Sequence, residues 1–297
     1  MRVPAAAPSV RAILHAPTGA VALLAQGRHP AGPCDEIFPD PIEKLMPTAL
    51  AATAHSPEQA VPLVLALLFD DRADVRGEQE ACVRQFLGES ALADATALAS
   101  QVAQLDSMLR LPLAELAFPA LRKRPRPELL SLIACADAMA RIDGEVSLFV
   151  YCVGCMLHRQ LSKSLDPSAS WRAGRKKPLD VLDEIALLLS MIAHGGIVRN
   201  GEVSAVVAER AYAAGMHAIL PDANIAYAPP TEGFGALDKA WIALDGLDGI
   251  GKTLLIEGML ATIGPAGKPT VAQSDLLRTA CAVLDCPLPS MLDHMQP

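Results

Sequence analysis

The sequence predicts an all-α protein, a helical bundle built from two diverged helical units, and three observations support this prediction. Apolar residues make up 52% of the chain but aromatic residues only 4%, and the excess is Ala and Leu, both strong helix formers. Apolar residues recur at helical spacing over most of the chain, whereas runs of β-branched residues are nearly absent. The third observation is a weak self-similarity at a spacing of 123 residues, described below.

The first half of the chain reads as a lead-in followed by helices. Residues 1–44 are rich in Pro, Gly and Ala without a clear period and are expected to be weakly ordered. A helix start is predicted at Ser56, as an N-cap followed by Pro57 at the first helical position and Gln59 three residues after the cap. A second long helix is predicted over 91–109. Further helices are expected at 113–121, 128–141 and 147–165.

A linker is predicted at 166–178, where Pro, Ser, Gly and four basic residues interrupt the helical pattern. It separates a first helical unit at 45–165 from a second at 179–297. In the second unit, Thr270 and Gln273 have the spacing of a capping box. Its helices are expected near 179–194, 202–220, 234–245, 250–263 and 270–285.

The two predicted units align without gaps when the chain is shifted by 123 residues. The shift matches apolar positions and one helix cap, and it places the segment 246–251 on the Pro-containing segment 123–128. We therefore interpret the units as diverged copies. The matched pairs are Leu121 with Leu244, Leu132 with Leu255, Ile133 with Ile256 and Ser147 with Thr270.

One segment satisfies the phosphate-loop pattern G-x-x-x-x-G-K-[ST], through Gly246, Gly251, Lys252 and Thr253. A working phosphate loop also needs a strand before it and a further strand that supplies the acid for Mg²⁺. The residues after Thr253 read as helix, so a helix connection is the favoured interpretation and nucleotide binding by 246–253 is the alternative. We expect Lys252 to lie exposed at a helix start, where its removal leaves stability nearly unchanged.

Metal binding and catalysis find little support in the sequence. Cys152 and Cys155 form a C-x-x-C within a helical pattern, which we interpret as small apolar packing, because a zinc site needs two further ligands. Asp143 precedes Gly144 in a predicted turn, and the favoured interpretation is a turn followed by a helix cap at Ser147. Asp143 as a cation ligand is the alternative. No catalytic residue and no cofactor are expected.

Net charge and hydropathy limit the classes of partner that the chain can be expected to bind. The formal net charge of −8 argues against a nucleic-acid-binding body, and the longest apolar runs, 60–69 and 185–192, are shorter than the roughly 20 residues that cross a bilayer. Two basic loops, 122–126 and 172–177, are candidates for contact with anionic lipid headgroups or an acidic partner. Seven cysteines without disulfide spacing fit a reducing compartment. We expect a cytoplasmic protein that reaches membranes through a partner.

Several short sequence segments resemble the long C-terminal region of bacterial HtpX-like membrane zinc metallopeptidases, and they follow the same order and spacing as in that region. The resemblance covers residues 45–292, and no single segment is by itself specific for that family. The turn at Asp143 and the helix after it also resemble TerB-like helical domains. The matching segments are 54–57, 66–68, 110–113, 143–149, 276–278, 281–282 and 286–289.

The resemblance implies a module that works beside a membrane peptidase rather than the peptidase itself. The motif H-E-x-x-H is absent from the sequence, so no catalytic residue of that family can be assigned. The resembling TerB-like families place Glu where this chain has Val150, and in the second copy that position is Gln273, which suits a capping box. The expected function is a non-catalytic helical accessory or interaction module with a protein partner. A truncated gene product, a separately encoded module or a fragment would all fit this expectation.

Overall fold

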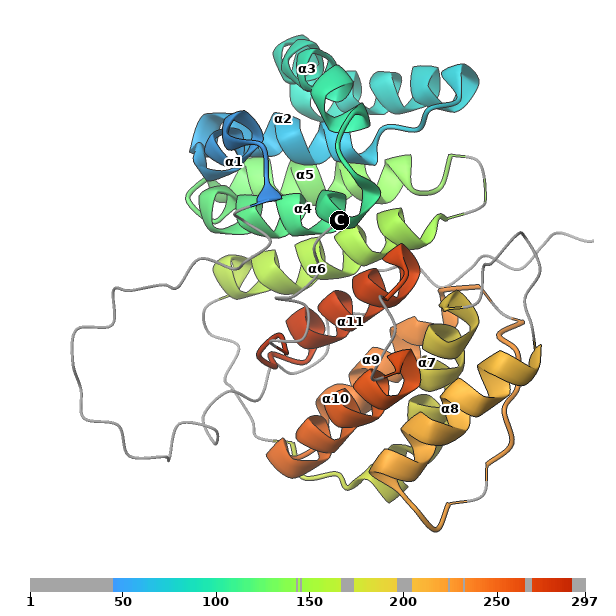
Figure 1. The fold of residues 1–297 in the computed structure, drawn as a ribbon. Coiled ribbons are helices and arrows are strands. Elements are labelled where there is room, and N and C mark those ends of the chain that lie inside the picture. Colours follow the sequence, from blue (N-terminus) through green and yellow to red (C-terminus); the bar gives the residue numbers. More distant parts are fainter. Residues whose placement is uncertain are drawn as a thin grey trace, which may run out of the picture. The chain divides into compact units, whose positions relative to one another are not determined.

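A computed structural model of the 297-residue chain describes residues 45–142, 144, 146–166, 174–196, 205–223, 225–231, 233–264 and 269–289 (Figure 1). Within these ranges every regular element is a helix, apart from one isolated bridge between Lys176 and Leu247, so the predicted all-α class is confirmed. The lead-in and Asp143 lie outside the described residues. The helices are α1 (Thr48–His55), α2 (Pro57–Leu68), α3 (Ala73–Ala103), α4 (Ser107–Leu121), α5 (Arg126–Met139), α6 (Leu148–Leu165), the short 3₁₀ helix η4 (Pro178–Val181), α7 (Leu182–Gly195), α8 (Ala205–Ile219), α9 (Ala236–Asp245), α10 (Gly249–Ile263) and α11 (Val271–Val283).

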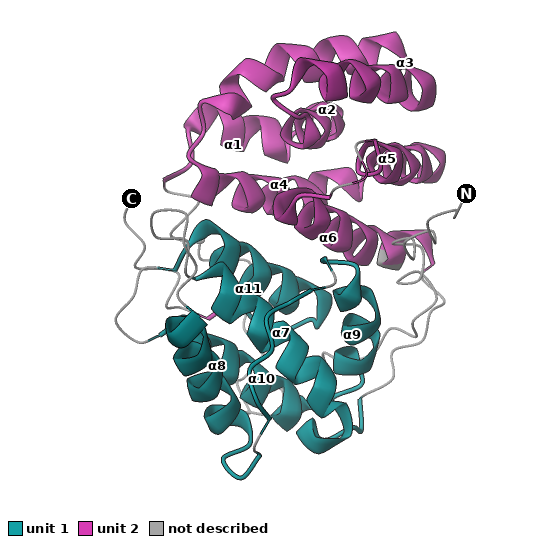
Figure 2. Cartoon of the chain, turned by 90° about the vertical axis from the view of Figure 1, so that its right-hand side faces the viewer, with its two compact units in different colours: residues 1–29, 168–288 teal, residues 30–167, 289–297 magenta. Residues whose placement is uncertain are grey.

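The helices form two compact units (Figure 2). Unit 2 contains α1 to α6, and unit 1 contains η4 and α7 to α11. The boundary between them, at residues 167 and 168, falls within the predicted linker. Each unit has its own buried apolar centre, which in unit 2 includes Leu63, Leu113 and Leu132 and in unit 1 includes Trp241 and Leu255.

The predicted helix start at Ser56 is correct, but its side chain does not cap the helix. The Ser56 hydroxyl donates to Glu58 Oε2 at 3.1 Å and makes no hydrogen bond to the backbone N–H groups of α2. Pro57 stands at the first helical position, where its missing N–H costs nothing.

The predicted helix over 91–109 is wrong at both ends. Helix α3 begins 18 residues earlier, at Ala73. The polar segment after Arg72 lacks a clear apolar stripe, so its helical structure was not predicted. Gly88 interrupts α3 with φ 89° and ψ 173°, a conformation that favours glycine and kinks the helix. Asp106 then accepts a hydrogen bond from Met108 N at 2.8 Å and starts α4.

The predicted caps of the last helix in each unit are confirmed. Ser147 accepts a hydrogen bond from Val150 N at 3.3 Å at the start of α6. Thr270 and Gln273 form a reciprocal capping box at the start of α11, with distances of 3.2 and 3.1 Å.

The two units share an order of helices and a pattern of helix contacts. Helices α5 and α10 begin at Arg126 and Gly249, and helices α6 and α11 begin at Leu148 and Val271, so both pairs are offset by 123 residues. The same offset pairs α2 with α7, α3 with α8 and α4 with α9. Contacts between α2 and α3, α3 and α5, α2 and α4, and α5 and α6 all have their counterpart in unit 1.

The tightest crossing of unit 1 joins α8 and α10 through two glycines. A Cβ atom on Gly215 would lie 2.7 Å from the carbonyl oxygen of Gly258, and a Cβ on Gly258 would lie 3.0 Å from that of Gly215. The two backbones therefore touch with no room for a side chain between them. The corresponding positions of unit 2 hold Leu92 and Cys135, both buried.

Among the described helices, none combines the length and the apolar character that crossing a bilayer requires.

Candidate functional site

The phosphate-loop motif joins two helices. Helix α9 ends at Asp245 where a phosphate loop would have its strand, and α10 begins at Gly249 within the motif. Asp248 caps α10, because its Oδ1 accepts a hydrogen bond from Gly251 N at 2.7 Å. The Asp248 carboxylate thus accepts the hydrogen bond of an N–H group that would face the phosphate in a phosphate loop.

The expectation that Lys252 is exposed is wrong. Its side chain is 5% exposed, and its Nζ donates to Asp245 Oδ1 at 2.8 Å and to the Leu284 carbonyl at 3.0 Å. The ammonium therefore ties the end of α9 to the end of α11, and losing it would remove one buried hydrogen bond from each of these two acceptors. Gly246 and Thr253 also make hydrogen bonds within the chain. The Thr253 hydroxyl donates to the Gly249 carbonyl at 3.0 Å, and the Gly246 carbonyl accepts from Lys176 N at 2.9 Å.

The described end of the basic linker is seated on this same turn. Lys176 N donates to the Gly246 carbonyl at 2.9 Å, and Asp248 N donates to the Lys176 carbonyl at 3.0 Å. A Cβ on Gly174 would overlap the Leu247 carbonyl oxygen, so the approach requires glycine. We call this arrangement of residues 174–179 on the segment 246–250 the linker joint.

Charges and exposed apolar groups gather at the linker joint. The Lys177 ammonium pairs with the Asp248 carboxylate, and this hydrogen bond holds the pKa of Asp248 below its ordinary value. Arg175 and Lys176 are exposed. Leu179 and Ile250 are 67% and 71% exposed, which makes them the most exposed large apolar side chains among the described residues.

The other predicted basic loop, 122–126, is partly neutralised by its own neighbours. Arg124 forms a two-pronged pair with Glu128, with distances of 2.8 and 3.0 Å, and Arg122 donates to the side chain of Gln160. Lys123 and Arg126 are exposed. This loop presents less unpaired charge than its sequence indicates.

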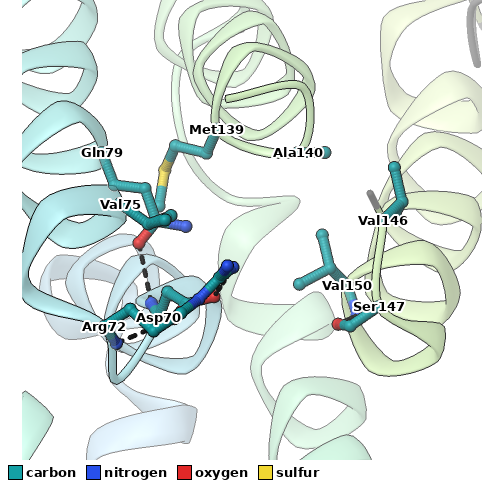
Figure 3. Close-up of a pocket in the computed structure, with 9 residues that line it drawn as sticks. All are labelled: Asp70, Arg72, Val75, Gln79, Met139, Ala140, Val146, Ser147 and Val150. Atoms are coloured by element: carbon teal, nitrogen blue, oxygen red, sulfur yellow. Dashed lines mark hydrogen bonds and ion pairs between the residues drawn. The ribbon is translucent and has the colours of Figure 1, made fainter. Parts of the chain in front are cut away.

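Unit 2 contains a cavity of about 270 Å³ beside the start of α6 (Figure 3). Figure 3 shows Val146, Ser147 and Val150 on one side of it and residues of α3 and of the preceding loop on the other. The loop after α2, the first turns of α3, the end of α5 and the start of α6 contribute to its lining. Its lining residues are Asp70, Arg72, Val75, Gln79, Met139, Ala140, Val146, Ser147 and Val150.

The wall opposite α6 is held by hydrogen bonds. Gln79, only 5% exposed, accepts from Asp70 N at 2.7 Å and donates to the Leu68 carbonyl at 3.1 Å. Asp70 forms a two-pronged pair with the Arg72 guanidinium, with both distances 3.0 Å, and also accepts from Arg72 N. These hydrogen bonds lower the pKa of Asp70 below its ordinary value. The wall is therefore ordered, and among the described lining residues one carboxylate is matched by one guanidinium.

The same junction in unit 1 is filled by a side chain of the protein. Gln273, which corresponds to Val150, donates from Nε2 to the Ile192 carbonyl at 3.3 Å and accepts from Thr270 N at 3.1 Å. The Thr270 hydroxyl donates to the Gly195 carbonyl at 2.8 Å. Helices α7 and α11 are consequently in contact, whereas α2 and α6 do not approach as closely over their described residues.

The cysteines and histidines of the described residues do not assemble a metal centre. Cys152 and Cys155 are fully buried on α6, consistent with apolar packing. His158 Nε2 lies 2.9 Å from Asp137 Oδ1, a pair that joins α5 and α6. In the portion that the structure describes, no three ligating side chains come together.

Comparison of the chain with protein-family models, curated proteins and solved structures found no match.

Sequence reasoning missed most of the cavity. Val150 was singled out only as a departure from the resembling families, and Gln273 only as a capping residue. Asp70, Arg72 and Gln79 belong to a loop and to the part of α3 that the sequence did not predict as helix. The hydrogen bonds of Gln79 to residues nine and eleven positions earlier depend on how α2 and α3 pack, which no local pattern reports.

Proposed function

We propose that this chain is a non-catalytic helical interaction module, and that the linker joint docks on a protein partner whose facing surface is apolar and acidic. The observation that carries the proposal is the exposure of Leu179 and Ile250, each of which lies two residues after one member of the Lys177–Asp248 pair. Large apolar side chains exposed together, with a basic rim, are typical of interaction sites.

The construction of the joint supports docking. Lys176 and Leu247 are linked through their backbones, and Lys177 is joined to Asp248, so Leu179 and Ile250 are carried on one fixed support. A pre-ordered surface loses less conformational entropy on association than a flexible one. Arg175 and Lys176 add positive charge that favours an acidic partner and speeds encounter with it.

The resemblance to the C-terminal region of HtpX-like peptidases supports a membrane peptidase as this partner, with anionic lipid as a secondary contact of the same basic residues. The alternative, a nucleotide-binding enzyme that uses 246–253, is disfavoured by the burial of the Lys252 ammonium and by its two acceptors.

The test is co-purification of the chain with a full-length HtpX-like peptidase in detergent, comparing the wild type with the variant carrying both Leu179→Glu and Ile250→Glu. We expect the double variant to lose at least tenfold in affinity, because two buried apolar contacts would become charged. Val206→Glu is the matched control, since Val206 is 57% exposed on α8 and lies outside the linker joint.

Undiminished binding by the double variant, or equal loss in the Val206→Glu control, would contradict the proposed surface. Flotation with vesicles of anionic and of neutral lipid separates direct lipid binding from binding to the peptidase. For the nucleotide alternative, Mg²⁺ and ATP at 100 times a dissociation constant would add about 2.7 kcal/mol of stability. We expect no rise in the melting temperature.

A further inference from the structure

The cavity of unit 2 is an opening in a junction that the same fold closes elsewhere. Val150 lines it with its short apolar side chain (Figure 3). In unit 1 the corresponding Gln273 spans from the end of one helix to the start of another. The volume of the cavity is about 270 Å³, and it is partly open to solvent. The opening is thus larger than the side chain that closes its counterpart.

The closed junction shows which chemistry this position accepts. In unit 1 the group that fills it is a carboxamide, which donates to a carbonyl at the end of α7 and accepts from the backbone N–H of the cap residue Thr270. The corresponding cap residue in unit 2 is Ser147, which lines the cavity. An amide from outside the chain can therefore take the place that the Gln273 amide has in unit 1.

The described lining combines polar groups with apolar side chains, and its charges are paired, which favours a neutral ligand that has both a polar and an apolar part. Val75, Met139, Val146 and Val150 supply apolar walls. The Asp70 carboxylate has its counter-charge in the Arg72 guanidinium, so the lining carries no net charge from this pair. A charged ligand would lose its hydration without gaining an unmatched charge of opposite sign, which is unfavourable.

We propose that this cavity is a binding site for a small neutral ligand in which an amide is attached to an aliphatic group. This is the chemistry of a capped aliphatic amino acid and equally of an apolar peptide segment. The site belongs to unit 2 and is independent of the linker joint, which belongs to unit 1, so either proposal can fail without the other.

The experiment titrates the full chain with N-acetyl-L-leucinamide and follows backbone amide resonances by NMR. We expect saturable shifts at Ser147 and Val150 with a dissociation constant in the millimolar range, as befits a ligand of so few atoms. Two charged relatives with the same number of non-hydrogen atoms, the anion N-acetyl-L-leucinate and the cation L-leucine N-propylamide, should bind at least tenfold more weakly. An acetylated tripeptide amide that binds more tightly than the single capped residue would identify a peptide segment as the source.

The decisive variant is Val150→Gln, which gives unit 2 the side chain that closes unit 1. We expect it to weaken binding of N-acetyl-L-leucinamide at least tenfold while the chain stays folded, as judged by an unchanged or higher melting temperature. Val206→Gln, on the exposed face of α8, is the control and should bind as the wild type does. Absence of saturable shifts, equal binding of the charged relatives, or unchanged binding by Val150→Gln would each overturn the proposal.

Discussion

In unit 1 the end of α7 and the start of α11 are joined by the side chain of Gln273, whereas in unit 2 the loop after α2 and the start of α6 face a cavity. The helices around both junctions have the same order and, apart from the contact of α7 with α11, corresponding contacts. A difference of one side chain, Gln273 against Val150, therefore accompanies the difference between a filled and an open junction.

At a second pair of equivalent positions, two chemically different side chains are both buried in the interior of their units. Lys252 of unit 1 corresponds to Leu129 of unit 2, and both are buried, with exposures of 4% and 2%. The leucine needs only apolar neighbours, but the lysine also needs Asp245 and the Leu284 carbonyl. A buried lysine can thus replace a leucine where acceptors are supplied.

The largest expected effect tests this second comparison. Lys252→Ala should lower the free energy of unfolding of unit 1 by about 3–5 kcal/mol, because it strips a buried carboxylate of its cation. Leu129→Ala should lower that of unit 2 by about 2–5 kcal/mol through the cavity it leaves. Urea unfolding measures both.

The matched control is the double variant Lys252→Met with Asp245→Leu. Replacing both members of a buried pair by apolar groups is often neutral, so much of the loss should be recovered. A loss below about 1 kcal/mol for Lys252→Ala would return this residue to the exposed position that the sequence indicated.

The next effect concerns the helix crossings. Gly258→Ala should destabilise unit 1 by about 1–3 kcal/mol, since the added methyl group would overlap the Ile219 side chain and lie 3.0 Å from the Gly215 carbonyl oxygen of α8. Gly154→Ala on α6 is the control, because no atom lies within 4 Å of a Cβ built there. That change should stabilise unit 2 by about 0.5–1 kcal/mol through helix propensity. Thermal unfolding of the two variants should therefore shift in opposite directions.

A reciprocal exchange tests the junctions directly. Gln273→Val should cost about 1–3 kcal/mol, because the Thr270 N–H would lose its Gln273 acceptor and the Ile192 carbonyl would keep only the Gly196 N–H as a donor. Val150→Gln should add up to about 1 kcal/mol by completing a capping box with Ser147. Chemical denaturation measures both free energies of unfolding. If neither substitution changes its value appreciably, the two positions do not have equivalent roles in the two junctions.

The smallest effect depends on pH. Lys177 lowers the pKa of Asp248, so the ionised carboxylate stabilises the folded state. This contribution is fully present above the ordinary aspartate pKa of 3.8 and is lost as the pH falls through the lower folded value. Asp248→Asn should lower the melting temperature slightly at pH 6 and leave it unchanged near pH 2. A difference that grows towards low pH would have the wrong sign for this pair.

The sequence predicted those helices whose ends carry a chemical signal. Pro57 marked one start, and Ser147, Thr270 and Gln273 marked two others with their caps. Helix α3 was missed over its first half because its residues are polar around most of the helix and Gly88 divides it.

The candidate sites were less accessible to sequence reasoning. The burial of Lys252 depends on the Leu284 carbonyl, 32 residues further along the chain, and nothing in the local pattern reports this contact. The cavity depends on the loop at Asp70 and Arg72 meeting the start of α6, which requires the packing of α2, α3 and α5 to be known. Only the exchange of Val150 for Gln273 was visible beforehand, through the alignment of the two units.

The kink at Gly88 has a consequence for cooperativity. Because the helical backbone is interrupted there, the two halves of α3 need not open together, and each can exchange its amide protons with solvent on its own. The first half carries Val75 and Gln79, which form the wall of the cavity, and the second half does not contribute to that wall. Ligand in the cavity should accordingly slow deuterium uptake before Gly88 and leave uptake after it unchanged.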